Sequence, residues 1–177
     1  KLTMKIIYVN PIKKLIISVF VLSLLTVTAM AQPAKLVVTE FLKNVRSGLN
    51  PEKAKDYMAD TVLAHQVNSE NPVTVKRTPE NYAAHVKKFL ELFGKFEFEV
   101  TELIAEDNKV YARWIQKGKH MATLDDYEPT GLPLVEYTSA VYRVENGKIV
   151  EYWLQSDRLG FEEQLKQNKI ASQTKSR

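Results

Sequence analysis

Residues 147–157 read Gly147-Lys148-Ile149-Val150-Glu151-Tyr152-Trp153-Leu154-Gln155-Ser156-Asp157, and Leu159-Gly160 and Gln164-Leu165 follow closely. Apolar and polar side chains mix along this stretch as they do in a half-buried strand, and the Asn146-Gly147 pair is a strong hairpin signal. The stretch therefore predicts a turn, an amphipathic strand ending in a carboxylate, and a short helix over 159–168. A carboxylate in that place can project into a pocket and handle protons.

The segments upstream of this hairpin predict an α+β domain, with helices first and strands afterwards. Apolar periodicity and first-turn prolines indicate helices over 34–46, 51–58 and 79–93. Extended segments are expected at 61–67, 96–102, 110–120 and 134–144, and the polar stretch 68–78 is expected to be a loop. Three helices packed on one strongly curved antiparallel sheet would form a cone with an apolar pocket at its wide end.

The first 31 residues have the pattern of a cleaved signal peptide. Lys13-Lys14 precede an apolar run over 15–27, and Ala29-Met30-Ala31 fits a small-x-small cleavage site. The run is shorter than the roughly 20 apolar residues that span a membrane, although an uncleaved anchor is the alternative. We expect cleavage after Ala31, a domain over 32–170 and a flexible tail over 171–177. The protein would then be periplasmic or secreted, without a stable membrane anchor.

Removal of this leader changes the charge balance of the chain. The 177 residues include 25 Lys and Arg against 21 Asp and Glu. Four of the lysines (Lys1, Lys5, Lys13 and Lys14) precede residue 32, so 21 basic and 21 acidic residues remain. A neutral domain lacks the basic surface that binds nucleic acid, so a nucleic-acid partner is not expected. The chain has no cysteine, which excludes disulfides and thiolate metal sites.

Several short motifs occur in an order and spacing that are typical of one protein family. They are Leu63-Ala64-His65-Gln66, Arg113-Trp114, Gly118-Lys119-His120, Pro129-Thr130-Gly131, Tyr142-Arg143-Val144-Glu145-Asn146-Gly147, Asp157 and Gln164-Leu165. Together they resemble the SnoaL-like polyketide cyclase family. The resemblance spans essentially the whole domain and implies an NTF2-like α+β cone.

The resemblance also implies a chemistry. Characterised cyclases of this family close a ring by intramolecular aldol condensation without a metal or a cofactor. By this resemblance Asp157 is the acid/base group, His120 lies near it, and His65 matches the family's early histidine. The chain departs from the family at residues 121–128, which are bulkier and more acidic than the glycine-rich stretch often found there. Its signal peptide is a second departure and points to a substrate other than a polyketide.

Strand alternation provides a second route to a candidate site. Three sets of alternate residues would each share one face of an unbroken strand. They are Val110, Ala112, Trp114, Gln116, Gly118 and His120; Val135, Tyr137, Ser139 and Val141; and Ile149, Glu151, Trp153, Gln155 and Asp157. The sets mix apolar and polar groups as a pocket lining does, and a β-bulge would flip one of them. Asp157 in an apolar pocket beside Trp153 would suit proton transfer near neutral pH, and His120 would polarise or orient a carbonyl group.

Each of these residues also has a structural interpretation. Asp157 can cap the helix that follows it, and His120 can simply bond the adjacent loop. The aromatic side chains can bind substrate or belong to the core; they are Tyr82, Trp114, Tyr137 and Trp153. His85 is expected at the surface or at the boundary of the core. His65, His120 and Asp157 are the ligand types of a two-histidine, one-carboxylate site, but nothing in their spacing demands a metal.

Three hypotheses follow from the sequence. The first is an exported, cofactor-independent acid/base enzyme of cyclase, aldol, isomerase or hydrolase type that acts on a small, partly apolar carbonyl compound. The second is a binding protein that holds a small apolar molecule in the same cone without converting it. The third is an interaction domain that forms a homodimer through the outer face of the sheet. The residues expected on that face are Tyr111, Arg113, Ile115, Thr138, Ala140 and Tyr142.

Overall fold

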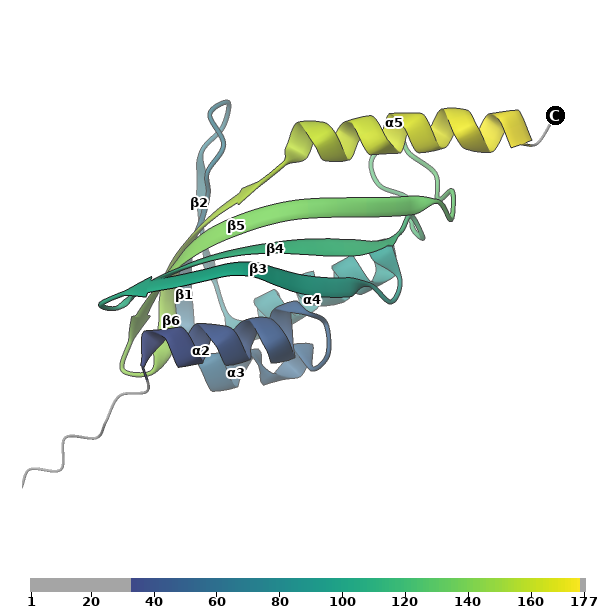
Figure 1. Cartoon of the computed structure of the whole chain (residues 1–177). Coiled ribbons are helices and arrows are strands. Elements are labelled where there is room, and N and C mark those ends of the chain that lie inside the picture. The colour runs from purple at the N-terminus through teal and green to yellow at the C-terminus, as the bar shows by residue number, and fades with distance from the viewer. Residues whose placement is uncertain (1–32, 176–177) are drawn as a thin grey trace, which may run out of the picture. The chain divides into compact units, whose positions relative to one another are not determined.

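A curved six-stranded sheet organises residues 33–175, the part of the chain that the computed structural model describes (Figure 1). The strands are β1 Met58–Gln66, β2 Val73–Arg77, β3 Glu97–Glu106, β4 Lys109–Lys119, β5 Pro133–Glu145 and β6 Lys148–Ser156, in the spatial order β2-β1-β6-β5-β4-β3. All neighbouring strands are antiparallel except β1 and β6, which run parallel. The expected antiparallel sheet is confirmed at every pairing but this one, where no hairpin determines the direction of one strand relative to the other. The predicted signal peptide over 1–31 lies outside the described residues.

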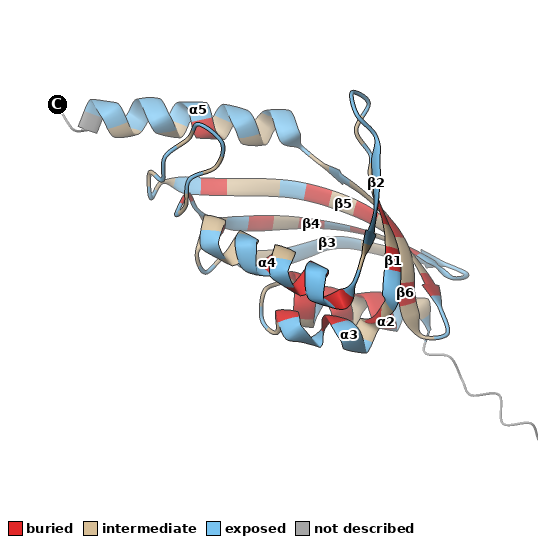
Figure 2. Cartoon of the chain, turned by 180° about the vertical axis from the view of Figure 1, so that it is seen from behind, coloured by how far each residue is buried: buried red, intermediate tan, exposed pale blue. Residues whose placement is uncertain are grey.

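The helices form two groups. The helical segments are α2 Ala34–Phe41 with its π-helical continuation η1 Leu42–Arg46, the 3-10 turn η2 Pro51–Lys53, α3 Ala54–Tyr57, α4 Pro79–Phe93 and α5 Arg158–Lys175. The first group, α2 to α4, covers one face of the sheet, here called the inner face, whereas α5 runs alongside β5 (Figures 1 and 2). Within residues 33–175, no helix combines the length and the hydropathy that crossing a membrane requires. The predicted α+β cone with three helices on a curved sheet is confirmed in its class and layering.

The hairpin between β5 and β6 forms where the sequence predicts it. Glu145 pairs with Lys148, and the two residues between them, Asn146 and Gly147, have φ values of 50° and 75°. A two-residue turn with positive φ at both positions matches the right-handed twist of the flanking strands. The Asn-Gly pair therefore sets the register between the end of β5 and the start of β6.

A β-bulge at Val150 decides which side chains of β6 face the helices. Ile149 and Glu151 pair with successive residues of β5, so Val150 between them has no partner. Ile149 and Tyr152 are consequently both buried against the helices, and Trp153 turns to the outer face. The shared face predicted for Ile149, Glu151, Trp153, Gln155 and Asp157 was wrong for Ile149, because the extra residue places Ile149 on the inner face whereas Glu151 and Trp153 lie on the outer face.

The strands β4 and β5 alternate regularly. The set predicted on β4 is confirmed on the inner face, where Trp114, Gln116 and His120 are all fully buried. On β5 the inward residues are Leu134, Glu136, Thr138, Ala140 and Tyr142. The predicted set Val135, Tyr137, Ser139 and Val141 therefore lies on the outer face, because Trp114 pairs with Thr138 rather than with a member of that set. For the same reason Thr138, Ala140 and Tyr142 are absent from the outer face, where they were expected.

Two segments have a secondary structure other than the one expected. Val73–Arg77, predicted to be part of a loop, forms the edge strand β2 against β1. Most of β2 is exposed, so no buried apolar stripe marks it in the sequence. Helix α5 continues to Lys175 beyond its expected end at Asn168, so the part of the predicted flexible tail that is described is helical.

Candidate functional site

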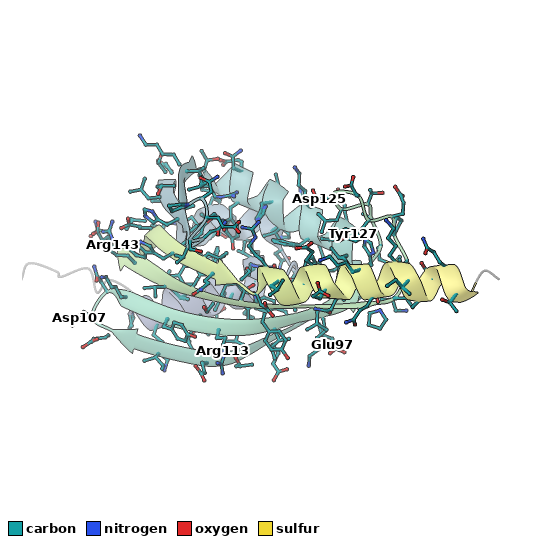
Figure 3. All side chains as sticks on the ribbon, turned by 90° about the horizontal axis from the view of Figure 1, so that it is seen from above. Glu97, Asp107, Arg113, Asp125, Tyr127 and Arg143 are labelled. Atoms are coloured by element: carbon teal, nitrogen blue, oxygen red, sulfur yellow. The ribbon has the colours of Figure 1, made fainter. Side chains whose placement is uncertain are left out.

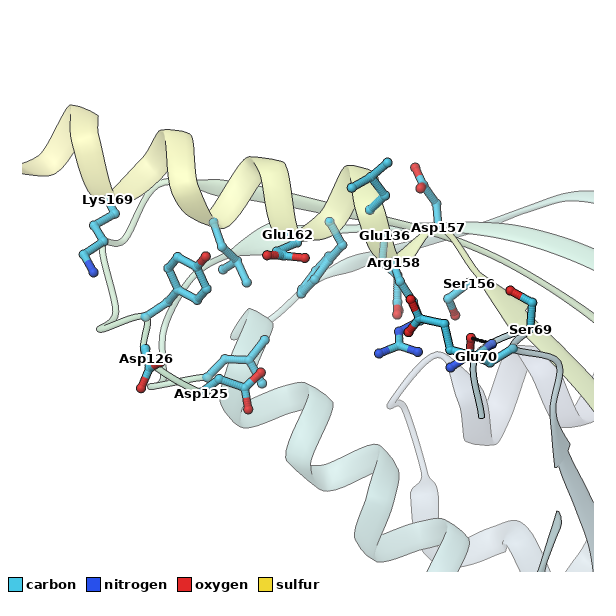
Figure 4. A pocket seen from close by; sticks show the side chains of 16 residues that line it. Ser69, Glu70, Asp125, Asp126, Glu136, Ser156, Asp157, Arg158, Glu162 and Lys169 are labelled. Atoms are coloured by element: carbon cyan, nitrogen blue, oxygen red, sulfur yellow. Dashed lines mark hydrogen bonds between the residues drawn. The ribbon is translucent and has the colours of Figure 1, made fainter. Parts of the chain in front are cut away.

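Two adjoining cavities lie between the inner face of the sheet, α4, the 67–73 segment and the start of α5. The inner cavity has a volume of about 820 Å³ and is lined by Arg46, Tyr82, His85, Glu136 and Tyr152 among others. The outer cavity has a volume of about 840 Å³ and lies between α5 and the loop with Asp125, Asp126 and Tyr127 (Figure 4). The two share six lining residues, which are Asn68, Ser69, Glu70, Glu136, Ser156 and Arg158. Each cavity has the size of a small-molecule site.

Arg46 provides a fixed cation in the wall of the inner cavity. It is the last residue of η1, whose wide turn places Leu42, Val45 and Arg46 all in the core. The Arg46 guanidinium carbon lies 4.4 Å from the centroid of the Phe89 ring, and Nη1 donates to Oε1 of Gln116 at 2.8 Å. Stacking on aromatic rings and a buried hydrogen bond hold this charge in one orientation. π-Helical turns of this kind are frequent at functional sites.

Glu136 lies beside Arg46 in the wall of this cavity. Its Oε2 atom lies 3.5 Å from Nη2 of Arg46, is buried and accepts no hydrogen bond, and the side chain is 15% exposed. Burial raises the pKa of Glu136, and the Arg46 charge opposes the rise only in part. A carboxylate in such surroundings binds a proton more readily than an ordinary glutamate. Glu136 is therefore a candidate general base.

Three further polar side chains of the inner cavity, His85, Tyr82 and Tyr152, are uncharged near neutral pH. Burial, together with Arg77, Arg46 and Lys88, lowers the pKa of His85 to about 4, so the imidazole is neutral. Burial raises the pKa of Tyr82 and of Tyr152, so both phenols keep their protons and can donate hydrogen bonds. The cavity thus combines two guanidinium groups, Arg46 and Arg158, and two acidic side chains, Glu70 and Glu136, with a neutral imidazole and phenol donors.

Asp157, the predicted acid/base residue, is exposed at the end of β6. Its Oδ1 accepts a hydrogen bond from the backbone N–H of Gly160 at 3.0 Å, which is a helix-cap contact at the start of α5. The residue borders the outer cavity, but its carboxylate points away from Glu136 and Arg158 (Figure 4). The geometry matches the capping interpretation of Asp157, and its catalytic role stays a prediction.

His120 and Trp114 are buried in the domain and do not line either cavity. Nδ1 of His120 lies 3.5 Å from the Thr130 hydroxyl, and the backbone of His120 bonds Leu132 and Gly131 of the following loop. Nε2 of His120 and Nε1 of Trp114 have no hydrogen-bond partner among residues 33–175. The contacts of His120 are those of a histidine that anchors the adjacent loop.

His65, Trp153 and Tyr137 lie on the outer face of the sheet, away from both cavities. His65 stacks on Trp153 with ring centroids 5.1 Å apart, and Tyr137 is 50% exposed. The His65 ring bonds Thr74 and Glu151, and Glu151 also accepts from Arg143, each at 2.8 Å. Burial pushes the pKa of Glu151 upward, but the hydrogen bonds from His65 and Arg143 outweigh it and lower the pKa.

These outer-face residues are not brought together with the other predicted site residues. Figure 3 shows Arg143 at the end of the sheet opposite the loop with Asp125 and Tyr127. In the same range of residues, 33–175, no three His, Asp or Glu side chains gather in a way that would hold a metal ion. Of the seven predicted site residues, only Tyr82 lines the inner cavity.

Sequence reasoning missed Arg46, Glu136 and His85 as residues of the cavity. Arg46 follows an apolar helical stripe, and only the π-turn brings it inward. Glu136 is on the inner face of β5, between the inward residues Leu134 and Thr138. A charged residue at an inward position is unusual, so it could have indicated a site once the inward positions of β5 were known. His85 borders the apolar stripe of α4, and the curvature of the sheet decides that it faces a cavity.

Comparison with known proteins places this geometry in context. The sequence model of the SnoaL-like polyketide cyclases matches residues 36–165. No curated protein matches the sequence significantly.

Solved structures share the fold at low sequence identity. A candidate polyketide cyclase from Acidithiobacillus ferrooxidans is 23% identical, with a TM-score of 0.67 over 80% of this chain and 99% of that one. IdmH, a candidate polyketide cyclase from Streptomyces antibioticus, is 22% identical, with a TM-score of 0.62 over 75% and 97% of the two chains. AclR, a candidate hydroxylase from Streptomyces galilaeus, is 19% identical, with a TM-score of 0.62 over 76% and 96%. Proteins named for different chemistries thus share this architecture.

Proposed function

Because the chain belongs to the SnoaL-like polyketide cyclase family, we propose that it is an acid/base enzyme acting on a small, partly apolar carbonyl compound. The inner cavity holds the substrate, and Glu136 removes the proton next to the carbonyl group. The observation that carries the proposal is the buried, unbonded Oε2 atom of Glu136, 3.5 Å from the Arg46 guanidinium. The polyketide cyclase names of the similar structures support the choice of a carbonyl substrate.

Each group in the cavity has one part in this reaction. The Glu136 carboxylate takes the α-proton, and the electron pair of the C–H bond passes to the carbonyl oxygen as an enolate. Arg46 stabilises the charge that develops on that oxygen, aided by the O–H donors of Tyr82 and Tyr152. The enolate carbon then attacks a second carbonyl or is protonated again, and Glu136 returns the proton. These steps require neither a metal nor a cofactor.

The test compares wild type with Glu136→Gln, which preserves the shape of the side chain and removes the base. Both proteins are incubated with cell-envelope and culture extracts, and untargeted mass spectrometry follows every compound. Loss of a general base slows turnover by about 100- to 10,000-fold. We therefore expect one or more compounds to be consumed by wild type and to persist with Glu136→Gln.

Asp157→Asn is the matched control, since it makes the same chemical change at the sequence-predicted residue. The proposal expects Asp157→Asn to consume the same compound as wild type. Consumption by Glu136→Gln and not by Asp157→Asn would return the catalytic role to Asp157. A compound that all three proteins retain and none converts would make the protein a small-molecule binder.

Export and self-association belong to the same proposal. The leader pattern, Lys13-Lys14 followed by an apolar run and Ala29-Met30-Ala31, supports export and cleavage after Ala31. A homodimer through the outer face stays a prediction, and the residues available there are Tyr111, Arg113, Ile115, Tyr137, Ser139 and Val141.

A further inference from the structure

Arg158 is an unpaired cation at the junction of the two cavities. It is the first residue of α5 and borders both cavities. Its exposed side chain makes no hydrogen bond or ion pair with any residue of 33–175, and its guanidinium extends from α5 into the space that Glu136 also faces (Figure 4). The positive end of a helix dipole does not favour a cation, so the helix itself provides no electrostatic reason for an arginine here.

The charges around Arg158 divide the cavities into two regions. Asp125, Asp126 and Lys169 border the outer cavity at the end away from Arg158, and Glu162 lies between that end and Arg158 (Figure 4). The inner cavity is lined by two cations, Arg46 and Arg158, and by two carboxylates, Glu70 and Glu136. Arg46 lies 3.5 Å from Oε2 of Glu136 and offsets the charge of that carboxylate, whereas no acid among residues 33–175 forms an ion pair with Arg158.

The pKa of His85, in the wall of the inner cavity, also indicates a positive electrostatic potential there. Arg77, Arg46 and Lys88 all lower the pKa of His85, in addition to the effect of burial. Nearby cations that disfavour a protonated imidazole also favour a bound anion. The inner cavity and its mouth are therefore suited to a ligand that combines an apolar body with one negative charge.

We propose that the ligand of the inner cavity is a carboxylic acid with a carbonyl group, and that Arg158 binds its carboxylate at the cavity mouth. This inference rests on the proposed function and names its substrate class. A guanidinium matches a carboxylate with two parallel N–H donors. The hydroxyl of Ser156, which borders both cavities, offers a further donor. The apolar body then lies against Tyr82, Phe89 and Leu154, with the carbonyl group directed toward Glu136 and Arg46.

The test uses two probes that share an apolar body and differ in charge. They are 2-oxo-4-phenylbutanoate and its methyl ester, titrated calorimetrically into the purified protein. A charge-assisted hydrogen-bonded pair changes affinity by about 10- to 100-fold. We expect the acid to bind at least about 10-fold more tightly than the ester. Arg158→Gln should remove that preference while leaving the affinity for the ester unchanged.

Two variants serve as controls. Arg113→Gln removes an exposed arginine of the outer face, which pairs with Glu102, and should leave both affinities unchanged. Glu70→Gln removes an acid that borders the same junction and should tighten binding of the acid by a few-fold.

Each outcome decides the proposal. Equal affinity for acid and ester, no measurable binding of the acid at millimolar concentration, or an acid affinity that Arg158→Gln does not change would each overturn it. Tighter binding of 4-phenylbutylamine than of the acid would also overturn it, because the carboxylates would then dominate the cavity. Binding of the acid through Arg158 without any turnover would uphold the ligand class and refute the enzymatic proposal alone.

Discussion

At the scale of single residues, burial shifts the pKa values of Glu136 and His85, both in the wall of the inner cavity, in opposite directions. Removal from water disfavours the charged form, which raises the pKa of Glu136 and lowers that of His85. The result is a carboxylate with increased proton affinity beside an imidazole that stays neutral. A site for proton transfer requires such a pair of environments.

The stability of the protein should record the shift of His85. Its pKa is about 4 in the folded state against an ordinary 6.5, so the unfolded chain binds more protons between these values. The free energy of unfolding should therefore increase as the pH rises from about 4 to 6.5, and decrease as the pH is lowered through the same window. Partial exposure limits the effect to about 1–2 kcal/mol.

Urea denaturation between pH 5 and 6.5 measures this effect, because most carboxylates are already ionised there. The rise in stability with pH should be smaller in His85→Gln than in wild type, while Arg113→Gln should keep the wild-type slope. An unchanged slope in His85→Gln would mean that the imidazole is protonated normally in the folded protein.

At the scale of elements, two contacts between a helix and a strand hold α5 and α4 against the sheet. The side-chain amide of Gln164 on α5 donates to the Val135 carbonyl and accepts from the Val135 N–H, both at 2.9 Å. Because β6 pairs with β5 only from Thr138 onward, this amide replaces a missing strand partner at the free edge of β5. The contact holds α5, and with it Arg158, beside the cavity mouth.

The C-terminal end of α4 contacts β4 just as closely. A Cβ atom added at Gly118 would lie 2.5 Å from the carbonyl oxygen of Phe93, the last residue of α4. The Cβ atom would be attached directly to the backbone of β4, and the carbonyl group is part of the backbone of α4. Neither can therefore move without displacing its strand or helix. Gly118→Ala should therefore cost about 1–3 kcal/mol of stability.

Thermal unfolding checks this contact. Gly118→Ala should melt several degrees below wild type, whereas Lys117→Ala, which alters an exposed neighbour on the same strand, should remain close to it. A wild-type melting temperature for Gly118→Ala would show that α4 and β4 are not in tight contact.

At the scale of the whole molecule, residues 33–175 form a domain that begins close to the predicted cleavage site. Helix α2 starts at Ala34, and Val37 and Val38 are already buried in the core. A cut after Ala31 would leave the described fold intact.

Recovery of the mature protein tests export. Expression of the full chain with fractionation of the cells should place the protein in the periplasm or medium, with Gln32 as its first residue by N-terminal sequencing. A chain that keeps Lys13-Lys14 and remains in the membrane fraction would instead be anchored by an uncleaved leader.

The sequence by itself determined the α+β class, the helix over 79–93, the Asn146-Gly147 hairpin and the inner face of β4, because propensity, turn chemistry and alternation are local properties. The capping alternative for Asp157 was available for the same reason, since a cap involves only the next three residues. The tertiary structure alone decided the site. The bulge at Val150 reversed the faces of β6, the register of β5 against β4 placed Glu136 inward, and the π-turn buried Arg46. Each of these depends on contacts between segments far apart in the chain, whose energies the local sequence pattern does not contain.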